Sequence, residues 1–263
     1  MLKRLQFFTA LFLFVPFAFA QKAEQFVSLN LCSDRLLIEL AHPEQIAAQS
    51  SYSRNALMML DKINHDLPTV EPTLTSLLPY LNTTVLINPT FYPQLSEKLK
   101  QLGVKVFPVT DPQTPEQLFD LILQIGELTG NNFYSKQLVE QLKLHNAHSK
   151  QAIVETLILS DTGVIDSNQQ PYRTLLELSE LNPMQTTITP QNFSLEKLLL
   201  SQPNQLVVLS DQYGYNERAE LIKHPILQEM FKNRPIIQLP LKYSYCFDHG
   251  LWQGAEKIKQ QIK

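Results

Sequence analysis

Short apolar runs alternate with amphipathic stretches along most of this chain. Each run has the length of a short buried strand, and together the runs cover residues 26–29, 45–49, 84–88, 104–109, 156–160, 205–210 and 235–239. Between them lie stretches such as residues 92–102 and 195–200, whose apolar positions recur at helical spacing. This alternation predicts an α/β fold in which parallel sheets are covered by helices. In such sheets, ligands bind beyond the carboxyl ends of the strands.

The middle of the chain, residues 114–150, has helical patterns without a strand. It opens on Thr114 as a capping hydroxyl, followed by a proline at the first helical position and an acid in the first turn. Gly130 interrupts the helical pattern, and a second pattern follows it. We expect one long helix here, acting as a spine between two α/β lobes at residues 21–113 and 151–263.

The first lobe is expected to begin with a strand that runs directly into a helix. After the apolar run at residues 26–29, a turn leads to Ser33 or Asp34, either of which can cap a helix. The apolar face of that helix would be formed by Leu36, Leu37 and Leu40. A strand that feeds a helix N-terminus leaves backbone N–H groups pointing into solvent or at a ligand.

Residues 1–20 have the pattern of an export signal. Two basic residues precede an apolar segment, and an Ala-Phe-Ala cleavage site ends it. A membrane anchor is the alternative, but the apolar run is shorter than the roughly 20 residues that span a membrane, and it contains Pro16. We expect cleavage before Gln21 and a soluble mature protein in the periplasm.

The charge of the chain narrows the choice of partners. The formal net charge is −3, and removing the two basic residues of the export signal leaves a mature protein near −5. A mildly acidic surface without charge clusters gives no reason to expect nucleic acid or an anionic membrane as a partner.

The chain contains two cysteines, Cys32 and Cys246. An even number of cysteines in an exported protein favours a disulfide. Two buried free thiols are the alternative at this point. A metal site is disfavoured because cysteines that bind metal usually come in close pairs.

The sequence contains no specific catalytic constellation. It has seven glycines and lacks a glycine-rich phosphate loop, a G-x-S-x-G motif and an H-E-x-x-H motif. Two alternatives to a binding function stay open. Cys246, with His249 nearby, could serve an exported thiol-dependent enzyme or redox protein. His145 and His148, three residues apart, could bind a free metal ion.

Aromatic and polar residues gather directly after the predicted strands. Tyrosine has a flat apolar ring with a polar tip, which suits a large ligand of mixed polarity. Two arginines in such loops could hold a carboxylate or phosphate group. Each residue taken alone could be ordinary packing or surface, and their shared position is what singles them out. They are Tyr52, Arg54, Phe91, Tyr92, Arg173, Tyr213, Tyr215 and Tyr243.

Several segments have the order and spacing of a known family. They are FVSLNLCSDRLLIELAHPEQIAAQS at the start, TPEQLFDLILQIGELTG in the middle, and SLEKLLLSQPNQLVVLS and NRPIIQLPLKYSYCFDHGLWQGAEKI in the second half. With them the chain resembles, over nearly all of residues 25–260, the substrate-binding proteins of ABC importers for ferric siderophores and cobalamin. Members of this class III group have two α/β lobes joined by one long helix.

The resemblance implies a periplasmic binding protein without catalytic activity or cofactor. Such a protein captures a metal chelate, a ferric siderophore or cobalamin, between its lobes and delivers it to an inner-membrane ABC permease. We expect a monomer. The eight residues listed after the strands become candidate ligand contacts in the cleft. The resemblance also implies that Cys32 pairs with Cys246.

Relatives dock on the permease through one acidic residue on each lobe. Glu196 matches that position in the second lobe. In the first lobe, Thr75 or Ser76 stands where an acid is usual, and Glu71 lies a few residues earlier. The resemblance therefore implies docking through Glu196, and through Glu71 if the first lobe takes part. The closing motif also differs from the usual C-G-G-P, so we expect a different cleft floor.

Overall fold

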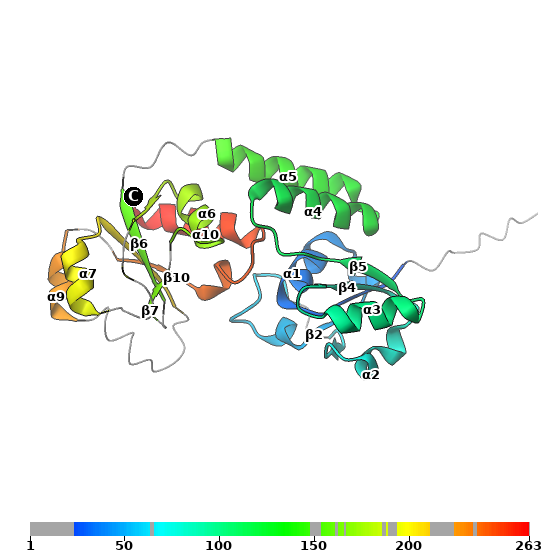
Figure 1. Cartoon of the computed structure of the whole chain (residues 1–263). Helices are drawn as coiled ribbons and strands as arrows, with labels where there is room; N and C mark the ends of the chain where they lie inside the picture. The colour runs from blue at the N-terminus through cyan, green and yellow to red at the C-terminus, as the bar shows by residue number, and fades with distance from the viewer. Residues whose placement is uncertain are drawn as a thin grey trace, which may run out of the picture.

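The protein folds into two α/β lobes with a five-stranded sheet in each (Figure 1). The predicted two-lobed architecture is therefore confirmed. Within the part of the chain that is described, no helix is both long and apolar enough to cross a membrane. The computed structural model describes residues 24–63, 66–147, 154–160, 163–165, 167–185, 188, 194–210, 224–233 and 236–262.

The first lobe contains a parallel sheet with the strand order β3-β2-β1-β4-β5. After β3 the chain crosses to the other side of β1, so the strand order reverses between β1 and β4. Ligands bind open parallel sheets at such a reversal, beyond the carboxyl ends of the strands. The strands are β1 (Phe26–Ser28), β2 (Ile46–Ser50), β3 (Thr69–Val70), β4 (Thr84–Ile87) and β5 (Lys105–Pro108).

The second lobe contains a mixed sheet with the path β10-β9-β6-β7, and β8 pairs with β6. β7 runs antiparallel to β6, whereas the other strand pairs are parallel. The antiparallel strand departs from the fully parallel sheet that the sequence predicts. The strands are β6 (Glu155–Ser160), β7 (Gly163–Ile165), β8 (Asn182–Pro183), β9 (Gln205–Leu209) and β10 (Ile237–Leu239).

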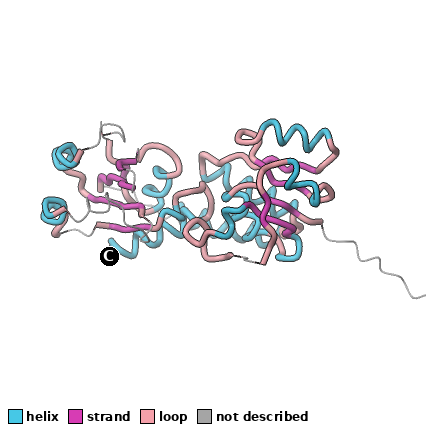
Figure 2. Tube along the Cα trace, turned by 90° about the horizontal axis from the view of Figure 1, so that it is seen from below, coloured by secondary structure: helices cyan, strands magenta, loops and turns pink. Residues whose placement is uncertain are grey.

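Helices cover both faces of the second sheet. Alternate residues of β6 enter different core clusters: Ile158 packs with α6 and α10, whereas Leu157 and Leu159 pack with α7 and α9. Figure 2 shows two helices outside this group of strands, at the far end of the molecule. The helices are α6 (Tyr172–Leu178), α7 (Leu195–Ser201), α9 (Pro225–Met230) and α10 (Gly250–Ile262).

The helix that follows β1 is α1 (Leu31–Leu40). Its cap is Asn30, whose Oδ1 accepts a hydrogen bond from the Ser33 N–H at 2.9 Å. The prediction that Ser33 or Asp34 caps the helix is therefore wrong, because Asn30 begins it one turn earlier. The predicted apolar face is buried as expected, with Leu36, Leu37 and Leu40 at most 1% exposed.

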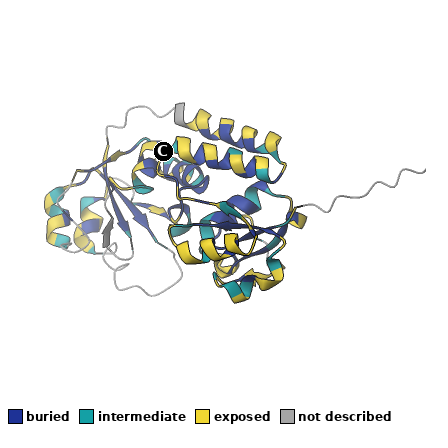
Figure 3. Cartoon of the chain, turned by 45° about the vertical axis from the view of Figure 1, so that its right-hand side comes forward, coloured by how far each residue is buried: buried dark blue, intermediate teal, exposed yellow. Residues whose placement is uncertain are grey.

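The remaining helices of the first lobe pack on the opposite face of its sheet. α3 buries Leu99 against Val27 of β1 and Val85 of β4. Figure 3 shows that the strands of this lobe are buried and that its helices expose their outer faces. The helical segments are α2 (Leu74–Leu77) and α3 (Pro93–Gln101), with the 3₁₀ turns η1 (Pro43–Gln45), η2 (Ser51–Arg54), η3 (Leu78–Tyr80) and, in the second lobe, η4 (Leu241–Tyr243).

Two helices, α4 (Pro115–Leu128) and α5 (Asn132–Ala147), connect the lobes and pack side by side (Figure 1). The predicted start is confirmed, since Thr114 Oγ1 accepts a hydrogen bond from the Gln117 N–H at 3.3 Å. The sequence predicts one long helix, but the structure has two. The chain leaves the helix at Gly130, whose φ of +75° is a conformation that favours glycine.

One hydrophobic core cluster runs through both lobes. Its members include Phe26 of β1, Leu142 of α5 and Ile237 of β10. The Trp252 ring of α10 lies 5.9 Å from the Phe119 ring of α4, and its Nε1 donates to the Leu142 carbonyl at 3.0 Å. Because a shared core joins the lobes, we expect only small changes in their relative position.

Candidate ligand-binding site

Three aromatic residues form a cluster at the edge of the first sheet where the carboxyl ends of its strands lie. Tyr52 follows β2 in η2, whereas Phe91 and Tyr92 follow β4. The Phe91 and Tyr92 ring centroids lie 6.5 Å apart in an edge-on arrangement. Burial raises the pKa of Tyr92, and the nearby Tyr52 and Glu71 raise it further, so these groups are close in space. We call Tyr52, Phe91 and Tyr92 the aromatic cluster.

The cluster is partly open to solvent. Tyr52 is 48% exposed and Phe91 is 60% exposed, while Tyr92 is half-buried. An exposed aromatic side chain leaves apolar surface in water, and contiguous surface of this kind often marks a binding site. The structure thus brings together three of the predicted ligand contacts.

The loop that carries Phe91 and Tyr92 is held by Asn88, which is 1% exposed. Its Oδ1 accepts a hydrogen bond from the Thr90 N–H at 2.9 Å, and its carbonyl accepts one from the Tyr92 N–H at 3.0 Å. Asn88 also forms a hydrogen bond with Asp111. Burial raises the pKa of Asp111, and this hydrogen bond offsets only part of the rise. These hydrogen bonds fix the backbone from which the Phe91 and Tyr92 rings project.

Sequence reasoning missed Asn88 and Asp111. The signal was available, since Asn88 ends the run that becomes β4 and Asp111 lies two residues after the run that becomes β5. A polar side chain at that position is a candidate for the edge of the sheet that binds ligand.

Arg54 lies next to the aromatic cluster in η2 and is exposed. Its Nη2 donates to the Leu67 carbonyl at 2.9 Å, which orients the guanidinium. A guanidinium carries five N–H donors, so one bond to the backbone leaves capacity for a carboxylate.

The predicted contacts of the second lobe have different outcomes. Arg173 is exposed in the first turn of α6, where its Nε bonds Glu177 Oε1 at 2.8 Å. A ligand would have to compete with Glu177 for this side chain. Tyr213 and Tyr215 lie outside the described residues.

Tyr243 does not line the site. It is 3% exposed and belongs to the core cluster shared by the lobes. A Cβ atom at Gly254 of α10 would lie 2.8 Å from the Tyr243 Cβ, so η4 and α10 are in close contact there. The prediction that Tyr243 contacts ligand is therefore corrected, because the tyrosine is needed for packing.

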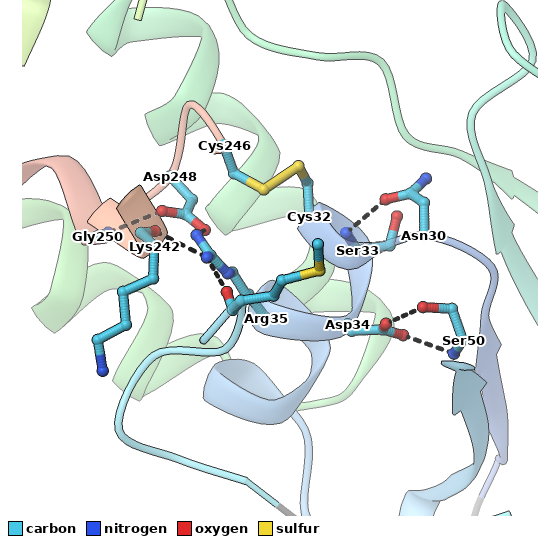
Figure 4. The surroundings of a disulfide bond; sticks show 11 residues. Asn30, Cys32, Ser33, Asp34, Arg35, Ser50, Lys242, Cys246, Asp248 and Gly250 are labelled. Atoms are coloured by element: carbon cyan, nitrogen blue, oxygen red, sulfur yellow. Dashed lines mark hydrogen bonds and ion pairs between the residues drawn. A yellow bond between two sulfur atoms is a disulfide. The ribbon is translucent and has the colours of Figure 1, made fainter. Parts of the chain in front are cut away.

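Cys32, in the first turn of α1, forms a disulfide with Cys246, 214 residues later (Figure 4). The pairing expected from the resemblance is confirmed. It ties the first helix of one lobe to the closing segment of the other. Cys246 consequently has no thiol, which the alternative of a thiol-dependent enzyme requires.

A buried ion pair lies beside the disulfide. Arg35 Nη1 is 3.3 Å from Asp248 Oδ2, and both side chains are at most 1% exposed. Arg35 also donates to the carbonyls of Met58 and Lys242 (Figure 4). Asp248 Oδ1 accepts the Gly250 N–H at 2.8 Å. The closing motif has Cys246-Phe247-Asp248-His249 in place of C-G-G-P, and its Asp248 joins the lobes through this ion pair.

The remaining candidates are positioned as follows. Glu196 is exposed in the first turn of α7, and Glu71 is exposed just after β3. His145 bonds the Gln141 carbonyl through Nδ1 at 2.8 Å, and His148 lies outside the described residues. Among the described side chains, no group of three or more His, Cys, Asp or Glu could hold a metal ion.

With these features, the chain has the fold of the class III periplasmic solute-binding proteins of ABC transporters. No protein-family model and no curated protein sequence matches it.

Solved structures with this fold bind different chelates. The periplasmic heme-binding protein HutB of Vibrio cholerae has a TM-score of 0.69 at 18% identity, covering 90% of this chain and 98% of that one. The vitamin B12-binding protein BtuF of Vibrio cholerae has a TM-score of 0.63 at 16% identity, covering 92% and 97%. The siderophore-binding protein BauB, bound to acinetobactin and ferric iron, has a TM-score of 0.69 at 14% identity, covering 92% and 94%. At these identities the likeness establishes the fold.

Proposed function

We propose that this protein is the periplasmic solute-binding component of an ABC importer and that it captures a metal chelate between its lobes. The observation that carries the proposal is the exposed aromatic cluster, which lies at the carboxyl ends of β2 and β4 in a two-lobed fold. Proteins with this fold that bind heme, vitamin B12 and a ferric siderophore support it.

The ligand class follows from the chemistry of the site. Tyr52, Phe91 and Tyr92 offer flat apolar surface and phenol hydroxyls, which suit an organic ligand with rings. Arg54 adds a cation beside them, and Arg173 adds one on the second lobe. We place Tyr213 and Tyr215 in the same cleft on the resemblance alone. A metal chelate with aromatic or conjugated groups can make contacts with both the rings and the cations.

Export and delivery complete the proposal. Residues 1–20 would direct the chain to the periplasm and be removed before Gln21. The mature monomer would dock on an inner-membrane permease through Glu196, with Glu71 as the first-lobe candidate. Glu71 lies close to Tyr92, so docking there would take place at the rim of the aromatic cluster.

Native mass spectrometry of protein purified from the periplasm tests the proposal, since a bound chelate adds a defined mass. Titration of the mature protein with cobalamin, hemin and a panel of ferric siderophores follows, read by tyrosine and tryptophan fluorescence. We expect at least one dissociation constant tighter than about 10 μM, which is roughly 7 kcal/mol. Weaker binding to every chelate would overturn the ligand assignment.

A matched pair of variants locates the site. Phe91→Ala removes an exposed ring of the cluster, and Phe133→Ala removes a ring on α5 that is 82% exposed, compared with 60% for Phe91. We expect Phe91→Ala to weaken chelate binding by about tenfold, as for loss of an aromatic contact, and Phe133→Ala to leave it unchanged. Equal effects would place the ligand elsewhere.

A further inference from the structure

A cavity lies at the end of the first sheet opposite to the aromatic cluster. Two adjoining hollows of about 620 and 350 Å³ share Ile38, Glu39, Asp61, Lys62 and Tyr134 as lining residues. Ile46, at the first position of β2, also lines it, whereas Tyr52 of the aromatic cluster follows the last position of β2. The cavity is therefore separate from the proposed chelate site.

Glu39 of α1 is the centre of the polar contacts in this cavity. Its side chain is 11% exposed. Tyr134 of α5 donates its hydroxyl hydrogen to Oε1, and Lys62 Nζ lies 2.8 Å from Oε2. His249 Nε2 is 3.9 Å from the same Oε2. Burial and Glu39 together raise the pKa of Tyr134 to about 12, so the phenol stays protonated and acts as a donor.

The contacts of Lys62 indicate which kind of ligand group the cavity can bind. Its ammonium contacts a carboxylate and lies 5.8 Å from the centroid of the Tyr134 ring. A carboxylate and an aromatic face are the groups that bind an organic ammonium ion. The Lys62 side chain is 58% exposed, so its ammonium can exchange into solvent at little cost.

The rest of the lining suits a short methylene chain. The walls include the apolar side chains Ile38, Ala41, Pro43 and Ile63. At the rim, Asp61 presents a second carboxylate that is 79% exposed and lies 3.3 Å from Lys242 Nζ. Two carboxylates joined by an apolar wall match a molecule with an ammonium group at each end.

We propose that this cavity binds an aliphatic diamine. One ammonium takes the place of Lys62 between Glu39 and the Tyr134 ring, the methylene chain lies on the apolar wall, and the second ammonium reaches Asp61. The cavity is lined by α1, the segment after η2, α5, Gln253 of α10 and His249, which directly precedes α10. A bound diamine would therefore contact elements of both lobes.

Isothermal titration of the mature protein with 1,5-diaminopentane tests this site, with 1,5-pentanediol as the neutral match. We expect the diamine to bind and the diol not to bind. Lys62→Met removes the competing ammonium and should tighten diamine binding about fivefold, the worth of a partly exposed ion pair. Glu39→Gln removes the carboxylate charge and should weaken it at least tenfold.

The outcomes separate this site from the chelate site. Phe91→Ala should leave diamine binding unchanged, whatever it does to chelates. Lys62 is mostly exposed, so Lys62→Met keeps the test decisive even if Glu39→Gln does not fold. Equal binding of diol and diamine, or no gain of affinity in Lys62→Met, would overturn the proposal.

Discussion

Asp34 is a carboxylic acid that is fully buried between α1 and the first sheet. Its carboxyl group accepts hydrogen bonds from the Ser28 hydroxyl, the Ser50 hydroxyl and the Ser50 N–H, the last at 3.0 Å. Burial raises its pKa from 3.8 to about 7, although these hydrogen bonds lower it. The folded protein therefore holds this proton more tightly than the unfolded chain does.

Because folding raises the pKa of Asp34, this group stabilises the fold more at acidic pH than at neutral pH. The contribution of Asp34 to the free energy of unfolding is complete below pH 4, falls as the pH rises towards 7, and is level above that. We expect the wild-type protein to lose about 2 kcal/mol of stability between pH 5 and pH 8 through this group. Urea unfolding of Asp34→Asn at both pH values should show that this loss is gone. The exposed Asp120→Asn should keep it, and a variant of Asp34 that kept it would contradict the assignment.

Arg54 offers a second test at the level of a single side chain. Its guanidinium is exposed beside the aromatic cluster and is oriented by Leu67. Arg54→Ala should weaken an anionic ferric siderophore by about 1–3 kcal/mol, because a charge-assisted hydrogen bond is lost. Cobalamin, which is nearly neutral, should bind almost as before. Calorimetric titration of both chelates measures the difference, and an equal loss for the two would count against a charge contact.

The solvent exposure of individual aromatic residues could not be predicted from the sequence. Tyr52, Phe91 and Tyr243 are all aromatic residues near strand ends or turns, and the first two are on the surface whereas Tyr243 is in the core. The difference depends on Gly254 of α10, which lets η4 approach closely. This contact is between η4 and α10, and no local sequence pattern predicts that the two elements approach each other there.

At the level of the elements, the contact between α4 and α5 depends on Gly126. A Cβ atom at this position would lie 2.3 Å from the Ser135 Cβ and 2.1 Å from its Oγ. Rotation of the serine cannot relieve the first contact. Gly126→Ala should therefore separate the helices and cost about 1–3 kcal/mol of unfolding free energy, although alanine favours a helix.

Chemical unfolding of Gly126→Ala checks this prediction, with Gln124→Ala on the exposed face of α4 as the control. The control should change stability by less than about 0.5 kcal/mol. If Gly126→Ala is as stable as the control, the helices can adjust to the added methyl group. The close packing at Gly126 would then not contribute to the free energy of unfolding.

The elements that sequence predicted well are those with several buried residues in a row. Every residue of β4 and of β9 is buried, all but the first residue of each are apolar, and both strands appear where expected. β3, β7 and β8 have two or three residues each, too few for a periodic pattern, so they were missed. The division of the predicted spine depends on the conformation of Gly130, and glycine within a helical pattern is compatible with either outcome.

At the scale of the whole molecule, the lobes are joined by independent kinds of contact. They share a core cluster, the disulfide between Cys32 and Cys246, and the buried pair of Arg35 and Asp248. The disulfide was implied by the resemblance, but the ion pair was not, since its partners are 213 residues apart and nothing in the two motifs that contain them relates one to the other. A junction of this kind favours a cleft that is largely formed before ligand binds.

If the protein serves a permease as proposed, a rigid junction also affects how it docks. Because the lobes keep their relative position, docking groups on the two lobes would stay at a fixed separation with or without ligand. Under the proposed function, Glu196→Lys should reduce ligand-dependent stimulation of the permease ATPase by about tenfold, since an attractive charge contact becomes a repulsive one. The same variant should bind its chelate with unchanged affinity, because Glu196 is an exposed residue of α7 and not part of the aromatic cluster.

Reconstituted permease in proteoliposomes provides the measurement, and Glu140→Lys provides the matched control. Glu140 is exposed on α5, so its reversal changes the net charge equally but on another surface. Stimulation should be lost with Glu196→Lys and kept with Glu140→Lys. If both variants stimulate the ATPase equally, docking does not use Glu196. If Glu71→Lys alone removes stimulation, docking depends on the first lobe, at the rim of the aromatic cluster.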